Sequence, residues 1–67
     1  MLQPPEVTLR QLDVWRLIAM GKTNVEIALA LGIKLATVKT HVERLYNSIG
    51  ALSRVEAAIM WHKLGKK

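Results

Sequence analysis

The sequence predicts an all-α domain, a compact bundle of four helices, and two patterns support this fold class. Three segments fit the capping box, in which a hydroxyl side chain and a Glu or Gln side chain three residues later each accept a hydrogen bond from the other residue's backbone N–H. They are Thr8–Gln11, Thr23–Glu26 and Ser53–Glu56. Glycine tolerates the left-handed conformation that commonly ends a helix, and the four glycines lie where helices would end: Gly21, Gly32, Gly50 and Gly65. The sequence shows no alternation of polar and apolar residues that would indicate strands.

These signals divide the chain into a lead-in and four helices. Pro4 and Pro5 cannot lie inside a helix, so we interpret residues 1–7 as an extended lead-in or the remnant of a linker, and residues 8–67 as the domain. The expected helices span residues 9–20, 24–31, 35–49 and 54–64.

The second expected helix ends at Gly32 after about two turns, and the third begins almost at once. This spacing is typical of a helix-turn-helix, with a small residue where the helices cross, a glycine in the turn and apolar residues that hold the helices at a steep angle. The residues in these roles are Ile27, Ala28, Leu31, Gly32, Ile33 and Val38. One continuous helix would lay its polar face along the protein, whereas the break lets the third helix protrude.

The third helix has two contrasting faces at about 100° per residue. Its apolar stripe, expected to face the core, consists of Val38, Val42, Leu45 and Ile49. The opposite side carries small, hydrogen-bonding or charged residues, namely Ala36, Lys39, Thr40, Glu43 and Asn47. A helix face of this composition fits the major groove of DNA, where side chains read donors and acceptors on base edges. The alternative is an ordinary solvated face.

The composition of the chain limits the classes of partner and site that it can have. Ten Lys and Arg against five Asp and Glu give a net charge of +5, which favours a polyanionic partner, although a basic domain can also be merely soluble. The chain has no cysteine, so disulfides and thiolate metal sites are excluded. No apolar run approaches the roughly 18 residues of a membrane span, and the start lacks the features of a signal peptide. We therefore expect a soluble, cytoplasmic protein with no membrane partner.

Catalysis is not expected. A domain of 67 residues has little room for a deep cavity. Ser48 and Ser53 lack a nucleophile elbow, no glycine-rich phosphate loop is present, and the acidic residues are scattered. We interpret His41 as a packed, hydrogen-bonded histidine, and His62 has no partner at ligand spacing, so no metal and no other cofactor is predicted.

The fourth helix is apolar almost all round, although a surface helix needs only one apolar face. The residues are Val55, Ala57, Ala58, Ile59, Met60, Trp61 and Leu64. The surplus predicts a second buried surface, and a homodimer through this helix would place two third helices one DNA turn apart, roughly 34 Å. The alternative is that both faces pack within the monomer, against Trp15 and the lead-in.

An ordered set of residues resembles the LuxR-type (GerE, or NarL/FixJ) helix-turn-helix domain over residues 7–62. The set comprises Thr8, Arg10, Asp13, Val14, Leu17-Ile18-Ala19, Gly21, Asn24, Glu26-Ile27-Ala28, Leu31, Ile33, Thr37-Val38-Lys39, His41-Val42, Arg54 and Ala57. The resemblance implies sequence-specific binding of double-stranded DNA by the output domain of a bacterial transcriptional regulator, with the third helix in the major groove and the fourth helix used for dimerisation. RNA polymerase is a further candidate partner. The family's usual phospho-receiver or ligand sensor is missing, so we expect a domain cut from a longer protein or a single-domain regulator.

The site residues follow from the helix faces and from the resemblance. The residues predicted to read bases are Lys39, Thr40 and Glu43. Those predicted to contact the DNA backbone are Thr23, Asn24, Lys34, Thr37 and Arg44. The dimer contact is assigned to Val55, Ile59 and His62. Thr23 has the alternative of being a helix cap only, and Lys34 leaves the third helix without a capping hydroxyl. Two rival functions are a sigma-factor-like DNA-binding tail and a small helical protein-interaction module.

Overall fold

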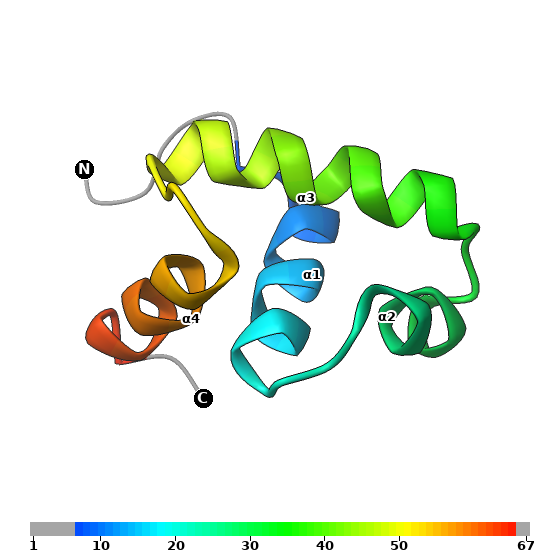
Figure 1. The fold of residues 1–67 in the computed structure, drawn as a ribbon, viewed down its shortest axis with the longest axis horizontal. Helices are drawn as coiled ribbons and strands as arrows, with labels where there is room; N and C mark the ends of the chain where they lie inside the picture. The colour runs from blue at the N-terminus through cyan, green and yellow to red at the C-terminus, as the bar shows by residue number, and fades with distance from the viewer. Residues whose placement is uncertain (1–6, 66–67) are drawn as a thin grey trace.

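The computed structural model describes residues 7–65 and contains, over that range, four α-helices and no strand. The helices are α1 (Leu9–Ala19), α2 (Asn24–Leu31), α3 (Leu35–Ile49) and α4 (Arg54–Lys63). Figure 1 shows α3 lying along one side of the molecule, α1 behind and below its middle, and α2 and α4 on either side of α1. The all-α, four-helix prediction is confirmed.

The helix bounds agree closely with the sequence signals. α2 and α3 have the expected bounds, whereas α1 and α4 each end one residue earlier than expected, at Ala19 and Lys63. Residues 1–6 of the expected lead-in lie outside the described residues. Val7 is described, and its side chain is buried immediately before the Thr8 cap.

Two of the three predicted capping boxes are complete. The Thr8 hydroxyl accepts from the Gln11 N–H, and the Gln11 side chain accepts from the Thr8 N–H. Thr23 and Glu26 form the same pair of bonds, at 3.1 and 2.8 Å. These reciprocal bonds fix where α1 and α2 begin.

The prediction of a third capping box is wrong for one of its two hydrogen bonds. The Ser53 hydroxyl accepts from the Glu56 N–H, but Glu56 Oε1 accepts from the N–H of Leu52 instead of Ser53. The reason is the backbone: φ is −157° at Ser53 but −79° at Thr23, so the chain enters α4 from a different direction and brings the preceding N–H to the carboxylate.

The helix-turn-helix has the expected packing. Ile27 and Val38 are fully buried, and Ala28 is buried in the same core, where α2 packs against α3. Gly32 has φ +66°, in the left-handed region that favours glycine, and its N–H donates to the Ala28 carbonyl. In Figure 1 α3 is seen from the side and α2 nearly end-on, so the two helices cross steeply.

The core consists mainly of residues from α1 and α3. The stripe predicted for α3 is confirmed, because Val38, Val42 and Leu45 are buried and Ile49 packs against them. α4 is attached to α1 through two tryptophans. The Trp15 and Trp61 rings meet edge to face with centroids 5.5 Å apart, and the Trp15 indole N–H donates to the Ala57 carbonyl at 2.7 Å. Such ring pairs add about 0.5–1.5 kcal/mol to the effect of burial.

Within residues 7–65, none of the helices has the length and apolar character needed to cross a membrane.

Candidate nucleic-acid interface

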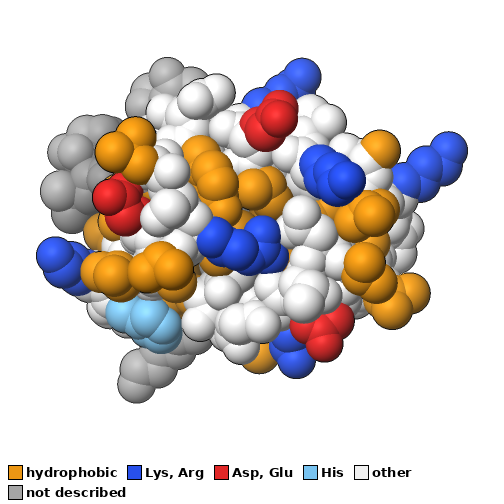
Figure 2. Space-filling view, viewed as in Figure 1, with side chains coloured by type: hydrophobic (Ala, Val, Ile, Leu, Met, Phe, Trp, Pro, Cys, Tyr) orange, Lys and Arg blue, Asp and Glu red, His pale blue; other side chains and the backbone are white. Residues whose placement is uncertain are grey.

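The outer face of α3 is a continuous exposed surface. Lys39, Thr40 and Glu43 are all exposed, and they lie opposite the stripe that is buried against α1 and α2. The structure therefore brings the three residues predicted to read bases together on one face. Figure 2 shows basic side chains over α3 and at its N-terminal end, with an acidic side chain among them.

Thr40 has a restricted hydrogen-bonding role. Its hydroxyl donates to the Ala36 carbonyl at 3.2 Å, one turn earlier in α3. A threonine hydroxyl has one proton and two lone pairs, so in this arrangement Thr40 presents its acceptor lone pairs and its methyl group to a partner. These groups suit a base amino group or the thymine methyl group.

Glu43 and Lys39 are not paired with each other. Between residues 7 and 65, the only ion pair is Arg10 with Asp13, at 3.9 Å on α1. The i, i+4 pair that could have turned Lys39 toward a base is absent. Both charged groups on the outer face are therefore available to a ligand.

The start of α2 gathers two of the residues predicted to contact the DNA backbone. Thr23 is the N-cap, so its predicted capping role is confirmed, and its hydroxyl is engaged by the Glu26 N–H. Asn24 is the first helical residue and is half-buried, and its Oδ1 accepts from the Arg54 guanidinium at 2.8 Å. A helix N-terminus favours anions because unpaired N–H groups and the helix dipole point outward there.

The start of α3 carries two more of these residues, both exposed. Lys34 occupies the N-cap position and makes no capping hydrogen bond through its side chain, as the sequence predicts. Thr37 lies in the first turn. Because a lysine side chain cannot accept a hydrogen bond, the first N–H groups of α3 receive no partner from the side chain at the cap.

Replacing Lys34 by serine should therefore raise the free energy of unfolding by about 1 kcal/mol, because a hydroxyl cap is added and a charge that opposes the helix dipole is removed. Urea melts of both proteins would measure this. Affinity for duplex DNA should fall at the same time, since a positive charge is lost. An unchanged urea midpoint would show that serine at this position does not cap α3.

Arg44 lies away from the other backbone-contact residues, toward the C-terminal half of α3. It is exposed and lines a groove between α3 and the start of α1. The other residues in the groove are Thr8, Gln11, Asn47 and Ser48. The position places a positive charge on the flank of the outer face.

α4 has one buried and one exposed apolar face. Ala57 and Trp61 pack on α1, whereas Val55 is 68% and Ile59 49% exposed. His62, the third residue assigned to the dimer contact, is also exposed. Figure 2 shows hydrophobic side chains and a histidine over α4. The alternative that the apolar faces of α4 pack within the monomer is therefore correct for one face, which packs against Trp15. The lead-in lies largely outside the described residues.

Arg54 has no role predicted from the sequence, yet it connects α4 to the start of α2. It is the first residue of α4 and is half-buried, and its guanidinium donates to Asn24 Oδ1 and to the Lys22 carbonyl, both at 2.8 Å. A local signal was present, because a cation at a helix N-terminus opposes the dipole and needs acceptors elsewhere. The position of those acceptors cannot be read from the local sequence.

The expectation for His41 is wrong in part. The side chain is half-buried, and Nδ1 is shielded from solvent, yet this nitrogen has no hydrogen-bond partner among residues 7–65. The nitrogen is thus shielded from water without a compensating hydrogen bond from residues 7–65. In the same part of the chain, no group of three or more His, Asp or Glu side chains is placed to hold a metal ion.

Comparison with known proteins identifies the family. Residues 6–61 match the sequence model GerE, described as bacterial regulatory proteins, luxR family. The chain is 40% identical to the transcriptional regulatory protein LiaR of Bacillus subtilis over 57 residues, which cover 85% of this chain and 27% of LiaR. It is 41% identical to the nitrate/nitrite response regulator protein NarL of Escherichia coli over 58 residues, which cover 87% of this chain and 27% of NarL.

A third relative is the HTH-type transcriptional activator RamA of Corynebacterium glutamicum, 36% identical over 63 residues, which cover 94% of this chain and 22% of RamA. The chain thus spans about a quarter of the length of these relatives. The family match covers most of the chain and coincides with the helix-turn-helix of the structure. The chain therefore belongs to the luxR family of bacterial regulatory proteins and is a helix-turn-helix domain that binds DNA in transcription regulation.

Proposed function

We propose that this domain binds duplex DNA sequence-specifically, as the output domain of a bacterial transcriptional regulator, with α3 in the major groove. The observation that carries the proposal is the outer face of α3. It is exposed and polar along its length, while the opposite stripe is buried, and the steep crossing with α2 makes it protrude. The major groove is wide enough to admit a helix presented in this way.

Each of the three base-reading residues has a distinct chemistry in this proposal. The Lys39 ammonium group only donates, which suits the O6 and N7 acceptors of guanine. Glu43 carries a carboxylate that forms no ion pair within the described part of the chain, and this group suits the amino group of cytosine. Thr40, whose proton is donated to Ala36, acts as an acceptor or a methyl contact.

The backbone contacts position the domain without reading sequence. We assign them to the starts of α2 and α3 and to the flank of α3, that is to Thr23, Asn24, Lys34, Thr37 and Arg44. Thr23 contributes through its N-terminal position in α2, since its hydroxyl already serves as the cap.

On the operator, two copies would associate through the exposed face of α4. Val55 and Ile59 would form the apolar centre of this contact, with His62 beside them. Two-fold symmetry would then place the two α3 helices in successive turns of the major groove, on the same side of the DNA. RNA polymerase is a candidate further partner of the bound dimer, and the cytoplasm, where bacterial DNA lies, is the proposed location.

Glu43→Gln tests whether α3 faces the groove. The negative charge of the DNA phosphates repels the Glu43 carboxylate, so the variant should bind random duplex DNA more tightly. It should also lose preference at one base pair, because the proposed acceptor for a cytosine amino group is changed. The plot of log affinity against log salt concentration should also steepen. Fluorescence anisotropy on random duplexes and on single-base variants of a selected site would measure both effects.

Glu56→Gln is the matched control, because Glu56 is exposed on α4 and undergoes the same change of charge. It should change affinity less than Glu43→Gln does. If both variants behave alike, α3 does not face DNA. If affinity rises on every sequence with base preference unchanged, Glu43 restrains non-specific binding and reads no base.

A further inference from the structure

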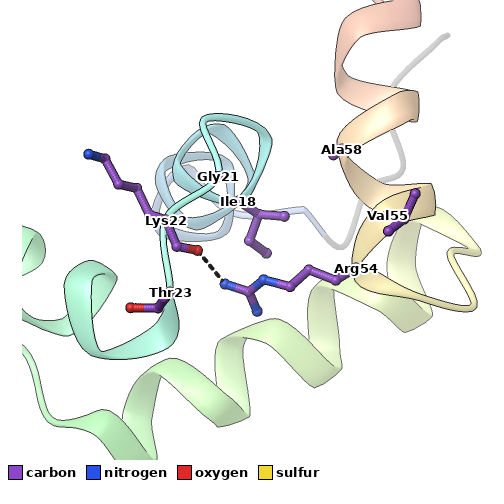
Figure 3. Close-up of a pocket in the computed structure, with 7 residues that line it drawn as sticks. All are labelled: Ile18, Gly21, Lys22, Thr23, Arg54, Val55 and Ala58. Carbon is purple, nitrogen blue, oxygen red and sulfur yellow. Dashed lines mark hydrogen bonds between the residues drawn. The ribbon is translucent and has the colours of Figure 1, made fainter.

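The helix proposed for dimerisation and the helix start proposed for phosphate contact lie on opposite sides of α1. α4 packs mainly on α1, and α2 packs mainly on α3 (Figure 1). A side chain from the start of α4 nevertheless reaches the start of α2. Figure 3 shows the Arg54 side chain extending from α4 to the Lys22 carbonyl, in the segment that joins α1 to α2.

The Arg54 guanidinium holds both neighbours of the α2 N-cap. Nη2 donates to the Lys22 carbonyl and Nη1 donates to Asn24 Oδ1, each at 2.8 Å, and Thr23 lies between these two residues. The guanidinium is planar, and its donors have fixed directions. One side chain therefore tethers the chain on both sides of the N-cap of α2, in addition to the Thr23–Glu26 capping bonds.

The contact also sets the orientation of the Asn24 side chain. A guanidinium has only donors, so the amide atom that faces Arg54 is the oxygen. The Asn24 Nδ2 group consequently lies on the other branch of the amide and remains available to donate to a phosphate. Without Arg54, the amide would be free to rotate.

The positive charge of Arg54 does not stabilise α4. A cation in the first turn opposes the helix dipole, and the nearby Glu56 carboxylate accepts from the Leu52 N–H, with no ion pair to Arg54 among residues 7–65. The acceptors that satisfy Arg54 are 30 and 32 residues away along the chain. The arginine thus serves the start of α2.

We propose that Arg54 is a positioning residue for DNA binding, which holds the Thr23–Asn24 start of α2 in the geometry that meets a phosphate. Because Val55 follows directly on the exposed face of α4, the same contact links the proposed dimer surface to the DNA backbone. This inference rests on the proposed function. Arg54 acts through Asn24 and the α2 backbone and does not itself touch DNA.

The test compares Arg54→Met, Arg54→Lys and the control Lys63→Met, which removes a positive charge from an exposed position at the other end of α4. In the DNA-free protein, Arg54→Met should accelerate hydrogen exchange at the Glu26 and Ile27 amides, which both bond to Thr23. Lys63→Met should leave these amides unchanged. Unchanged exchange in Arg54→Met overturns the proposal, whatever the protein binds.

The second measurement is affinity for a selected duplex. Arg54→Met should lower it by roughly tenfold, the size of one lost hydrogen bond to a charged group. The loss should shrink when Asn24 is already alanine, and the salt slope should stay at the wild-type value, because the amide contacts that depend on Arg54 are uncharged. Arg54→Lys, which keeps the charge but not the two-acceptor geometry, should give an intermediate loss.

Several results would overturn the proposal. An equal loss in the Asn24→Ala background, with the salt slope reduced by about 0.9, would mean that Arg54 contacts a phosphate directly. Wild-type affinity in either Arg54 variant would mean that it positions nothing. If Arg54→Met does not fold, Arg54→Lys decides by the same two readouts. If the wild-type domain binds no duplex, the proposed function is wrong. Hydrogen exchange at Glu26 and Ile27 then still shows whether Arg54 orders the start of α2.

Discussion

Lys39→Ala is expected to weaken binding to a selected operator by about 1–3 kcal/mol more than it weakens binding to random duplex DNA. The range is that of one specific base contact. Lys39 is exposed at the centre of the outer face of α3 and makes no ion pair with residues 7–65, so its ammonium group is available to a base. Competition titrations with both DNAs at one salt concentration would measure the difference.

Lys63→Ala provides the matched control, since it removes the same charge from the exposed end of α4. It should lower affinity for both DNAs equally and slightly. Equal losses on both DNAs for Lys39→Ala would assign this lysine to phosphate contact and remove it from base reading. The urea midpoint should stay near the wild-type value in both variants, because neither side chain is buried.

Ile59→Asp is expected to lower affinity for an operator with two half-sites by about 5- to 150-fold, while affinity for a single half-site stays nearly unchanged. The range corresponds to a coupling free energy of 1–3 kcal/mol between the two subunits. Ile59 is 49% exposed on the face of α4 that does not pack on α1, so an aspartate there meets solvent in the monomer and a desolvated apolar contact in the dimer. A buried unpaired carboxylate is strongly unfavourable.

The ratio of operator affinity to half-site affinity is the quantity to compare. Leu29→Asp is the control, because Leu29 is an exposed apolar residue on α2 and the same charge is introduced. Its ratio should remain at the wild-type value. If Ile59→Asp leaves the ratio unchanged as well, the dimer contact lies outside this face of α4.

Local patterns predict the helices and the core well for identifiable reasons. The bounds of α2 and α3 follow from Thr23, Gly32 and Gly50, because capping hydroxyls and left-handed glycines act within one turn of a helix end. The buried stripe of α3 follows from its period. Both features depend on residues a few positions apart.

Contacts between distant segments escape the same reasoning. The two hydrogen bonds of Arg54 join residues 30 and 32 positions apart, and the indole bond of Trp15 spans 42. At Ser53 the residue types fit a complete capping box, but the backbone conformation there directs the Leu52 N–H to Glu56 instead. The unpaired Nδ1 of His41 likewise reflects packing around α3.

Selection of bound fragments from a library of random duplex DNA, followed by sequencing, tests the central claim most directly. If α3 reads bases and two domains pair through α4, the enriched fragments should share a two-fold symmetric consensus, with half-sites about 10 base pairs apart from centre to centre. The same selection with Lys39→Ala should lose information at one position of each half-site. Recovery of fragments with no shared sequence would contradict base reading by this domain.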